Sequence, residues 1–486
     1  MSSLLLVATV AVGCAQDDAS PAPSVSSTTV ASATTAPNVY EEQRTAGVQT
    51  ALDAFGKAMV SGDTARLDQL VDDAATPAFR QRVQTGATNL SRAGVIADPA
   101  PPPPSPAPST SGAPSTSGAP SASAAAEPSP VRGHRLQLKE FRYQLAPTEE
   151  AETLVPPQLQ RRLDAQGSSD SWVAPVELHY ALGGSALPGV DEPEIVLATQ
   201  FVMARYGDDW TVVGDAAAIG GTPAPITVWD FPGLAADDVR TAGGESVITS
   251  YPGTATTVAH LRNLLPGAVA SVSAFWGDDW PRRAVVVATD RPAEFRGLAA
   301  SSATDITGAA AATVFSRVDT EHHTAIGQRI VLTPSAGDLP EPALGVVLRH
   351  ELTHVAARSV TSSSAPLWIT EGVAEYVGRT GTYTRFDDAA PDLAAEIRAQ
   401  NLPTALPADG EFAVDSEQAR LAYQSAWSVA AYVAERYGED GLKKLYTGVA
   451  AGGDTKRQDA AITEVTGRTR AQFVADWRAW LTKQVQ

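Results

Sequence analysis

Two histidines and a glutamate in the segment LGVVLRHELTHVAARSV have a spacing that suits metal chemistry. Apolar residues recur there at intervals of three and four, so the segment is predicted to form an amphipathic helix. His350 and His354 stand four residues apart and therefore share one helical face, where both imidazoles can bind the same metal ion. Glu351 lies beside them and can reach a water molecule without ligating the metal. The pattern predicts His350 and His354 as metal ligands and Glu351 as a general base.

A catalytic zinc ion usually has three protein ligands and one open position, so a third ligand is needed. Sixteen residues lie between His354 and Glu371, which belongs to the segment PLWITEGVAEYVG. We predict a second helix that begins at Pro366, with the Ser-rich stretch 361–364 as the turn between the helices. Glu375 follows Glu371 by four residues on the same predicted face. Geometry alone therefore admits either carboxylate as the third ligand.

The phrase HELTH followed by P-x-W-x-x-E-G-x-A-E-Y resembles the gluzincins of the peptidase-MA clan, which include thermolysin and the aminopeptidase-N type enzymes. The resemblance covers roughly residues 241–486. It implies a zinc-dependent peptidase that acts on a peptide or protein substrate, in a zincin-like domain with a small sheet and a helical C-terminal half. The site residues that it implies are the zinc ligands His350, His354 and Glu371, with Glu351 as the base.

Some details of this resemblance bear on activity and on the third ligand. The spacing from His354 to Glu371 is about two residues shorter than in the aminopeptidases, which predicts a tighter loop that is still compatible with a two-helix site. No GAMEN-like segment of the kind that holds a substrate N-terminus in aminopeptidases is found, so the sequence does not support exopeptidase activity and favours an endopeptidase. Glu371 matches the ligand position of the family. Gly372 is expected to give room for close approach of the metal helix. Glu375 is expected to accept a hydrogen bond from a ligand imidazole.

Two further features are predicted to shape the active site. Tyr423 opens the helical run AYQSAWSVAAYVAERYGEDGLKKLY, which resembles the region where related zincins supply a hydrogen bond to the developing oxyanion. Tyr423 is therefore a catalytic candidate, and a core aromatic residue is the alternative. The predicted strand over 329–334 precedes the metal helix, and the resemblance implies that it forms the cleft edge, where an extended peptide can add as a strand.

The elements around the motif predict an α+β domain. A helix over TATTVAHLRNLL, strands over RRAVVVATD and RIVLTP, and then several helices follow one another in the peptidase region, 241–486. A connector, 217–240, is predicted to join this region to the preceding domain.

The front domain, 39–216, is also predicted to be α+β. Helices on both sides of Gly62-Asp63 precede four strand-like runs, and a Gly-Asp-Asp turn marks a hairpin between the last two. This order resembles the nuclear-transport-factor-type cone fold. A Pro- and Ser-rich insertion, 97–130, interrupts the domain. No catalytic set of residues is found here, and we expect the domain to fold without the peptidase region.

The N-terminal residues predict export. The apolar run that ends at Cys14, the single cysteine, resembles the signal peptide and lipobox of bacterial lipoproteins, so residues 1–14 are predicted to direct lipid attachment at Cys14. Residues 15–38 are rich in Ser, Thr, Ala and Pro and are predicted to be a disordered tether. This organisation predicts a protein anchored by lipid to the outer face of the bacterial cell membrane, or secreted. The formal net charge of −19 argues against nucleic-acid binding.

Three functions remain open from the sequence. The first is an active zinc endopeptidase at the cell envelope. The second is a non-catalytic binding or scaffold protein that retains a peptidase fold, and the third is a front domain that itself binds a small molecule or partner. The presence of both histidines and of Glu351 and Glu371 favours the first.

Overall fold

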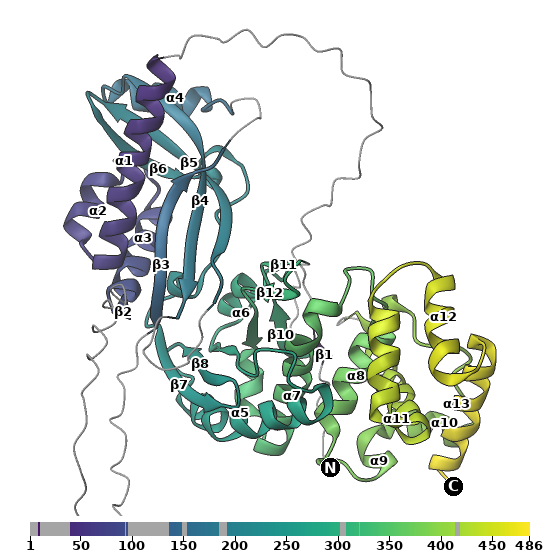
Figure 1. Cartoon of the computed structure of the whole chain (residues 1–486). Coiled ribbons are helices and arrows are strands. Elements are labelled where there is room, and N and C mark those ends of the chain that lie inside the picture. Colours follow the sequence, from purple (N-terminus) through teal and green to yellow (C-terminus); the bar gives the residue numbers. More distant parts are fainter. Residues whose placement is uncertain are drawn as a thin grey trace, which may run out of the picture.

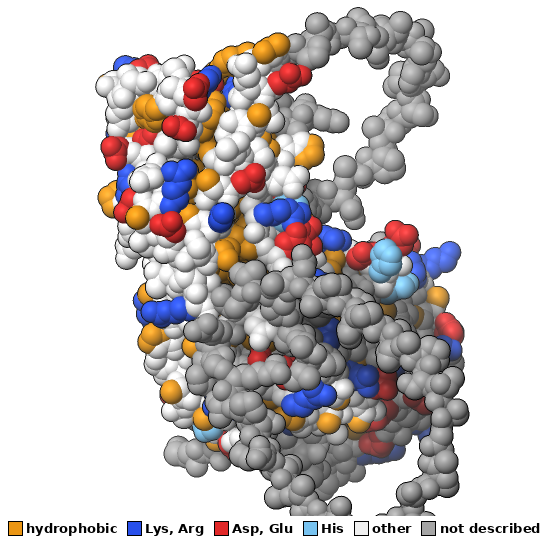
Figure 2. All heavy atoms as spheres, turned by 60° about the vertical axis from the view of Figure 1, so that its left-hand side comes forward, with side chains coloured by type: hydrophobic (Ala, Val, Ile, Leu, Met, Phe, Trp, Pro, Cys, Tyr) orange, Lys and Arg blue, Asp and Glu red, His pale blue; other side chains and the backbone are white. Residues whose placement is uncertain are grey.

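The computed structural model describes residues 8–9, 39–92, 94–95, 136–147, 153–183, 192–301, 308–319, 321–413 and 418–486. Figure 1 shows a front part built on one sheet, beside a C-terminal part built on a second sheet and many helices. Cys14, the predicted tether and the 97–130 insertion lie outside the described residues. Within the described residues, no helix has the length and apolar character needed to cross a membrane. Figure 2 shows acidic and basic side chains interspersed on one face of the described chain.

The front part consists of helices packed on a five-stranded sheet. Its strands have the order β2-β3-β4-β5-β6, with bounds Gly94–Val95, Gln137–Leu145, Asp170–Leu182, Ile195–Tyr206 and Asp209–Asp215. The helices are α1 (Val39–Ser61), α2 (Thr64–Leu70), α3 (Pro77–Ser91) and α4 (Pro157–Ala165). The four predicted strand runs correspond to β3, β4, β5 and β6. Helices α3 and α4 were not predicted.

The break between α1 and α2 falls at the predicted Gly62-Asp63. Gly62 has a φ of 68°, which suits glycine best, and the Asp63 side chain accepts a hydrogen bond of 2.9 Å from the Arg66 backbone N–H. The turn between β5 and β6 likewise uses Gly207, with a φ of 64°. These local signals fix element boundaries because their conformations are specific to glycine and to capping side chains.

The segment after β6 is bound to α3 along much of its length. It contains the short 3-10 helices η1 (Ala216–Ile219) and η2 (Val228–Asp230). Asn89 donates hydrogen bonds to the backbone oxygens of Trp229 (2.8 Å) and Phe231 (2.7 Å). Arg82 donates to the backbone oxygens of Ala224 and Pro225. We call residues 224–231 the strap. Side chains of an unpredicted helix hold it in place.

The C-terminal part contains a six-stranded sheet of order β1-β10-β13-β9-β8-β7. In that order the strands are Ala8–Thr9, Ala309–Val314, Arg329–Leu332, Val285–Ala288, Gly244–Ser250 and Ala235–Thr241; a separate hairpin joins β11 (Arg317–Asp319) to β12 (Thr324–Ile326). All but the last residue of strand β7 lies in the predicted connector, so residues 235–240 belong to the sheet and not to a linker.

The prediction that the strand over 329–334 forms the cleft edge is wrong. Strand β13 lies inside the sheet, parallel to β9 on one side and antiparallel to β10 on the other. The chain reverses through the β11–β12 hairpin after β10, which brings β13 back between β10 and β9. At this end of the sheet the outermost strand is the two-residue β1, and β10, with which it pairs, is the next strand inward.

Helices make up the rest of the C-terminal part and cover the sheet. They are α5 (Ala255–Trp276), α6 (Pro292–Leu298), η3 (Pro334–Asp338), α7 (Glu341–Ala357), η4 (Arg358–Val360), α8 (Leu367–Arg379), α9 (Phe386–Ala389), α10 (Pro391–Arg398), η5 (Asp409–Phe412), α11 (Ala419–Ala450), α12 (Thr455–Thr466) and α13 (Arg470–Gln484). The predicted α+β class, with a small sheet and a helical C-terminal half, is confirmed.

The two parts share a hydrophobic core because both faces of the second sheet are covered. In β9, Val286 and Ala288 belong to the core formed with the C-terminal helices, whereas Val285 and Val287 belong to the core that includes Phe55 of the front part. Arg329 of β13 also forms a buried ion pair with Glu192, which precedes β5. This continuity argues against the prediction that the front domain folds alone, and it shows how the sheet is fixed beneath the metal helix.

Candidate metal centre

Helix α7 is buried along nearly its whole length, which explains its composition. Pro342 lies in its first turn, where the missing N–H costs no helical hydrogen bond. Leu344, Leu348 and Leu352 are fully buried in the core. His350 and His354, with exposed fractions of 0% and 5%, are buried as well. Buried imidazoles need polar partners, and Glu371 of α8 is such a partner for both.

Three side chains from α7 and α8 converge on one point. The Nε2 atoms of His350 and His354 lie 3.1 Å apart, and Glu371 Oε2 lies 3.2 Å from the first and 3.5 Å from the second. Zinc bonds of roughly 2.0–2.1 Å in tetrahedral geometry separate ligand atoms by about 3.3 Å. The three observed separations fit that arrangement. Among the described residues, this is the single group of His, Cys, Asp and Glu whose placement could hold a metal ion.

Glu375 lies on the other side of the His350 ring. Its Oε1 is 3.5 Å from His350 Nδ1, and its Oε2 accepts a 2.5 Å hydrogen bond from Arg379 Nε. The structure thus brings Glu371, and not Glu375, into the group that could bind a metal. Glu375 is placed to orient the imidazole of His350, and the guanidinium of Arg379 balances its buried charge.

Glu351 is fully buried and faces the sheet strand β10. The hydroxyl of Thr313 donates a 2.6 Å hydrogen bond to Glu351 Oε2. The other carboxylate oxygen, Oε1, has no hydrogen-bond partner within the described residues. One oxygen is therefore held in position while the other can interact with a water molecule or substrate. Sequence reasoning missed Thr313 because no local spacing links it to α7.

Burial and mutual attraction shift the pKa values of this cluster. Burial opposes the charged form of His350, but the hydrogen bond with Glu371 and the charges of Glu375, Glu371 and Glu351 raise the pKa of His350 to about 9. Burial raises the pKa of Glu351, and the charges of the two histidines and the Thr313 hydrogen bond offset part of that rise. Burial would likewise raise the pKa of Glu371, but His354 and His350 hold it well below its usual range. The cluster thus favours a charged Glu371 and a more basic Glu351.

Glycines let the helices of the site approach one another. A Cβ on Gly372 would lie 2.6 Å from the backbone oxygen of Ala426 in α11, so Gly372 gives room to α11 and not, as predicted, to the metal helix. The close approach to α7 occurs at Gly378, where a Cβ would lie 3.0 Å from the backbone oxygen of Val346 and 3.3 Å from His350 Cβ. The two glycines thus allow α8 to pack closely against α11 on one side and α7 on the other.

Tyr423 lies in the first turns of α11, one helical turn before Ala426 and therefore on the face that packs against α8. It is 1% exposed, and its ring contacts Phe412 edge-on at a centroid distance of 5.1 Å. This placement leaves both the catalytic role and the core role open, so the oxyanion role stays a prediction.

A family model identifies the C-terminal region. Residues 343–483 match the model described as Peptidase MA superfamily. The matched region contains the HELTH motif on α7 and Glu371 on α8. No curated protein matches the chain.

The chain is also similar to solved structures of M1 zinc metallopeptidases. One is the enzyme from Deinococcus radiodurans, 13% identical, with a TM-score of 0.29 and a coverage of 52% of each chain. A mutant M1 zinc metallopeptidase from Deinococcus radiodurans, bound to a Tyr-Ser-Ala substrate, has 13% identity and a TM-score of 0.31. That match covers 52% of this chain and 53% of the mutant's chain. A two-domain mutant bound to L-arginine has 13% identity and a TM-score of 0.32, and the match covers 51% of this chain and 52% of the mutant's chain. The chain spans about half the length of these structures.

Proposed function

We propose that the chain is a zinc-dependent endopeptidase that acts at the outer face of a bacterial cell envelope. The observation that carries this proposal is the buried convergence of His350, His354 and Glu371, with Glu351 beside them and one of its oxygens available. Burying three such groups together costs free energy unless they bind something or perform chemistry. The match of residues 343–483 to a peptidase superfamily supports hydrolysis of peptide bonds as that chemistry.

The chain's own residues divide the work of hydrolysis. Bound zinc would supply a Lewis acid that lowers the pKa of water and polarises the peptide carbonyl. Glu351 takes the proton of the attacking water through Oε1, while Thr313 keeps the carboxylate oriented through Oε2. The protonated Glu351 then delivers this proton to the nitrogen of the leaving amine. Tyr423 is the proposed hydrogen-bond donor to the developing oxyanion.

Strand β10 is the proposed docking edge for the substrate. Its Thr313 contacts Glu351, so a peptide that adds to β10 would lie near the base. The pairing of Ala8–Thr9 with Ala309 and Ala311 supports this, since an extended segment already pairs with β10. Main-chain hydrogen bonds would provide affinity that depends little on the peptide sequence.

A blocked peptide gives the decisive test. Purified protein should contain about one zinc per chain and should cleave an internal bond of a peptide that is acetylated at its N-terminus and amidated at its C-terminus. A chelator should stop cleavage, and added zinc should restore it. The same peptide with free ends is the control: cleavage of that form alone would replace the endopeptidase with an exopeptidase. Bound zinc without cleavage of either form would favour the alternative, a non-catalytic scaffold.

The location rests on Cys14 and has its own test. We propose a lipid on Cys14 that holds the protein at the membrane. Cys14→Ala should release the protein from the membrane fraction or leave it unprocessed, because the acceptor thiol is gone. A variant that fractionates like the wild type would contradict the anchor and leave the peptidase proposal intact.

A further inference from the structure

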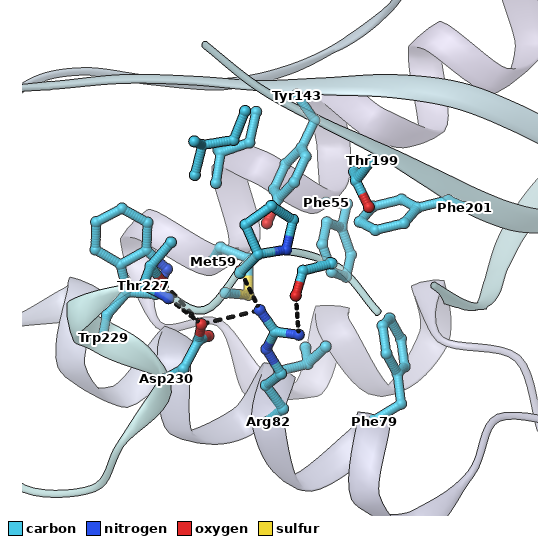
Figure 3. Close-up of a pocket in the computed structure, with 15 residues that line it drawn as sticks. Phe55, Met59, Phe79, Arg82, Tyr143, Thr199, Phe201, Thr227, Trp229 and Asp230 are labelled. Carbon is cyan, nitrogen blue, oxygen red and sulfur yellow. Dashed lines mark hydrogen bonds and ion pairs between the residues drawn. The ribbon is translucent and has the colours of Figure 1, made fainter. Parts of the chain in front are cut away.

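The front part contains a pocket between its sheet, two helices and the strap. Its walls come from β3, β4 and β5 on one side, α1 and α3 on another, and residues 224–230 of the strap on the third (Figure 3). The cavity volume is about 50 Å³. None of the metal-centre residues lines it, so its function is separate from the proposed peptidase activity.

The walls of the pocket are mostly aromatic. Phe55 packs edge-on against Tyr143 and Phe201, with ring centroids 5.4 and 6.1 Å apart, and Phe79 lies 6.3 Å from Phe201. Met59 completes this side, and its flexible side chain can adjust to an occupant. Such walls favour an apolar group.

The charged groups of the pocket already have partners. Arg82 Nη2 lies 2.9 Å from Asp230 Oδ2, and this guanidinium also donates to the backbone oxygens of Ala224 and Pro225. Asp230 Oδ2 accepts further hydrogen bonds from the N–H and hydroxyl of Thr227. Asp215 Oδ2 lies 3.6 Å from Arg82 Nη1, so one cation faces two carboxylates. The excess negative charge disfavours an anionic ligand.

The hydroxyl groups of Thr199 and Tyr143 also line the pocket. Thr199 Oγ1 is buried and has no hydrogen-bond partner within the described residues. The hydroxyl of Tyr143 points into the pocket from the sheet side (Figure 3). Burial raises the pKa of Tyr143, so its hydroxyl keeps its proton at neutral pH. A buried hydroxyl without a partner costs free energy, which an occupant with a matching polar atom would recover.

We propose that this pocket binds a small, neutral, mainly apolar molecule through one hydroxyl or carbonyl group, which hydrogen-bonds to Thr199 and Tyr143. The cavity is about one third of the roughly 150 Å³ that accommodates benzene in an apolar protein cavity. It therefore holds the polar end of the ligand, and the apolar remainder would contact the apolar walls, which include Met59 and Phe79.

Three probes of similar size separate the contributions to binding. Phenol carries a hydroxyl, toluene replaces it by a methyl group, and benzoate replaces it by a carboxylate. Titration of the full chain by ligand-observed NMR should give a phenol affinity about tenfold above that of toluene, the value of one or two satisfied hydrogen bonds. Benzoate should bind more weakly than either, because of Asp230 and Asp215.

Thr199→Val is the diagnostic variant. It should weaken phenol binding about tenfold and leave toluene binding unchanged, because only the hydroxyl is lost. The free variant should unfold at the same or a higher temperature, since it removes a hydroxyl that has no partner. Thr211→Val on β6 is the matched control: its hydroxyl donates a 2.8 Å hydrogen bond to Asp72, and it does not line the pocket. That variant should lower the unfolding temperature and keep the affinity for phenol.

The double variant Thr199→Val with Tyr143→Phe should erase the preference for phenol over toluene. Equal phenol affinity in the wild type and this double variant would overturn the proposal, as would benzoate binding more tightly than phenol. Absence of phenol binding by the folded wild type would overturn it too. None of these results depends on zinc or on peptide cleavage, so they leave the peptidase proposal standing or falling on its own tests.

Discussion

The metal centre and the front pocket are built from the chain in opposite ways. The centre takes His350, His354 and Glu371 from two consecutive helices, α7 and α8. The pocket takes its walls from segments that run from Phe55 to Asp230 and includes a strap with no regular sheet or α-helix. Metal chemistry demands particular residue types at helical spacing, whereas an apolar pocket uses residues that any core would use.

The two regions also differ in how their polar groups are satisfied. In the metal centre the buried ionisable groups are oriented by one another and by Thr313 and Arg379. In the pocket the charges are satisfied internally, whereas the buried hydroxyl of Thr199 has no hydrogen-bond partner within the described residues. Substitutions at the centre should therefore have large effects on metal and rate, while conservative ones in the pocket should change ligand affinity alone.

The largest effect is expected from removal of a metal ligand. His354→Ala and Glu371→Ala should each lose zinc under mild dialysis and lose activity with it, because two ligands remain where three are needed. Glu375→Gln should retain zinc with an affinity lower by roughly 10- to 100-fold, since it only orients His350. Zinc content after dialysis and competition with a chelator measure this order. If Glu375→Gln lost zinc more readily than Glu371→Ala, the roles of the two carboxylates would be reversed.

The next largest effect is expected from substitution of the general base, Glu351. Glu351→Gln keeps the size of the side chain but cannot accept a proton, so kcat/KM should fall by roughly 10²- to 10⁴-fold while zinc remains bound. The blocked peptide of the activity test and elemental analysis measure both quantities. Turnover like that of the wild type would remove Glu351 from the mechanism.

A third prediction concerns the connection between the two regions. Arg329 Nη2 donates a 2.8 Å hydrogen bond to Glu192, and both side chains are nearly buried. Arg329→Met should destabilise the whole chain by about 3–5 kcal/mol, because it leaves a buried carboxylate without its partner. Chemical denaturation measures this. The double variant that adds Glu192→Met should recover most of the lost stability. A front-part fragment, 39–231, should unfold without cooperativity, because its core includes residues of the second sheet.

Much of the local structure could be predicted from the sequence, and the reason is physical. The spacing of His350, Glu351 and His354 specifies a helical face, and the four strand-like runs separated by turn residues correspond to β3 to β6. The position of Gly62-Asp63 specifies a helix boundary. Each of these signals lies within a few residues of its structural consequence.

Long-range features could not be predicted in this way. Strand β13 was assigned to the cleft edge, because sequence order suggests neighbours but does not fix strand order. Gly372 was paired with the wrong helix, because a glycine signals a close approach without naming the partner. The segment 217–240 looked like a connector, although Asn89 and Arg82 hold much of it against α3. Thr313 and Arg379 reach the site only through tertiary packing.

The smallest effect is expected at Thr313, which touches the base and no ligand. Its 2.6 Å hydrogen bond lowers the pKa of Glu351, against the rise that burial causes. Thr313→Val removes this hydrogen bond, so the pKa of Glu351 should rise and the base should stay protonated up to a higher pH. The acidic limb of the kcat/KM profile should then move to higher pH, and activity near neutral pH should fall by a few-fold, of the order expected for about 1 kcal/mol. Thr313→Ser keeps the hydroxyl and should keep the limb in place. A uniform loss of activity at every pH, with an unmoved limb, would show that Thr313 supports the fold of β10 and does not tune the base.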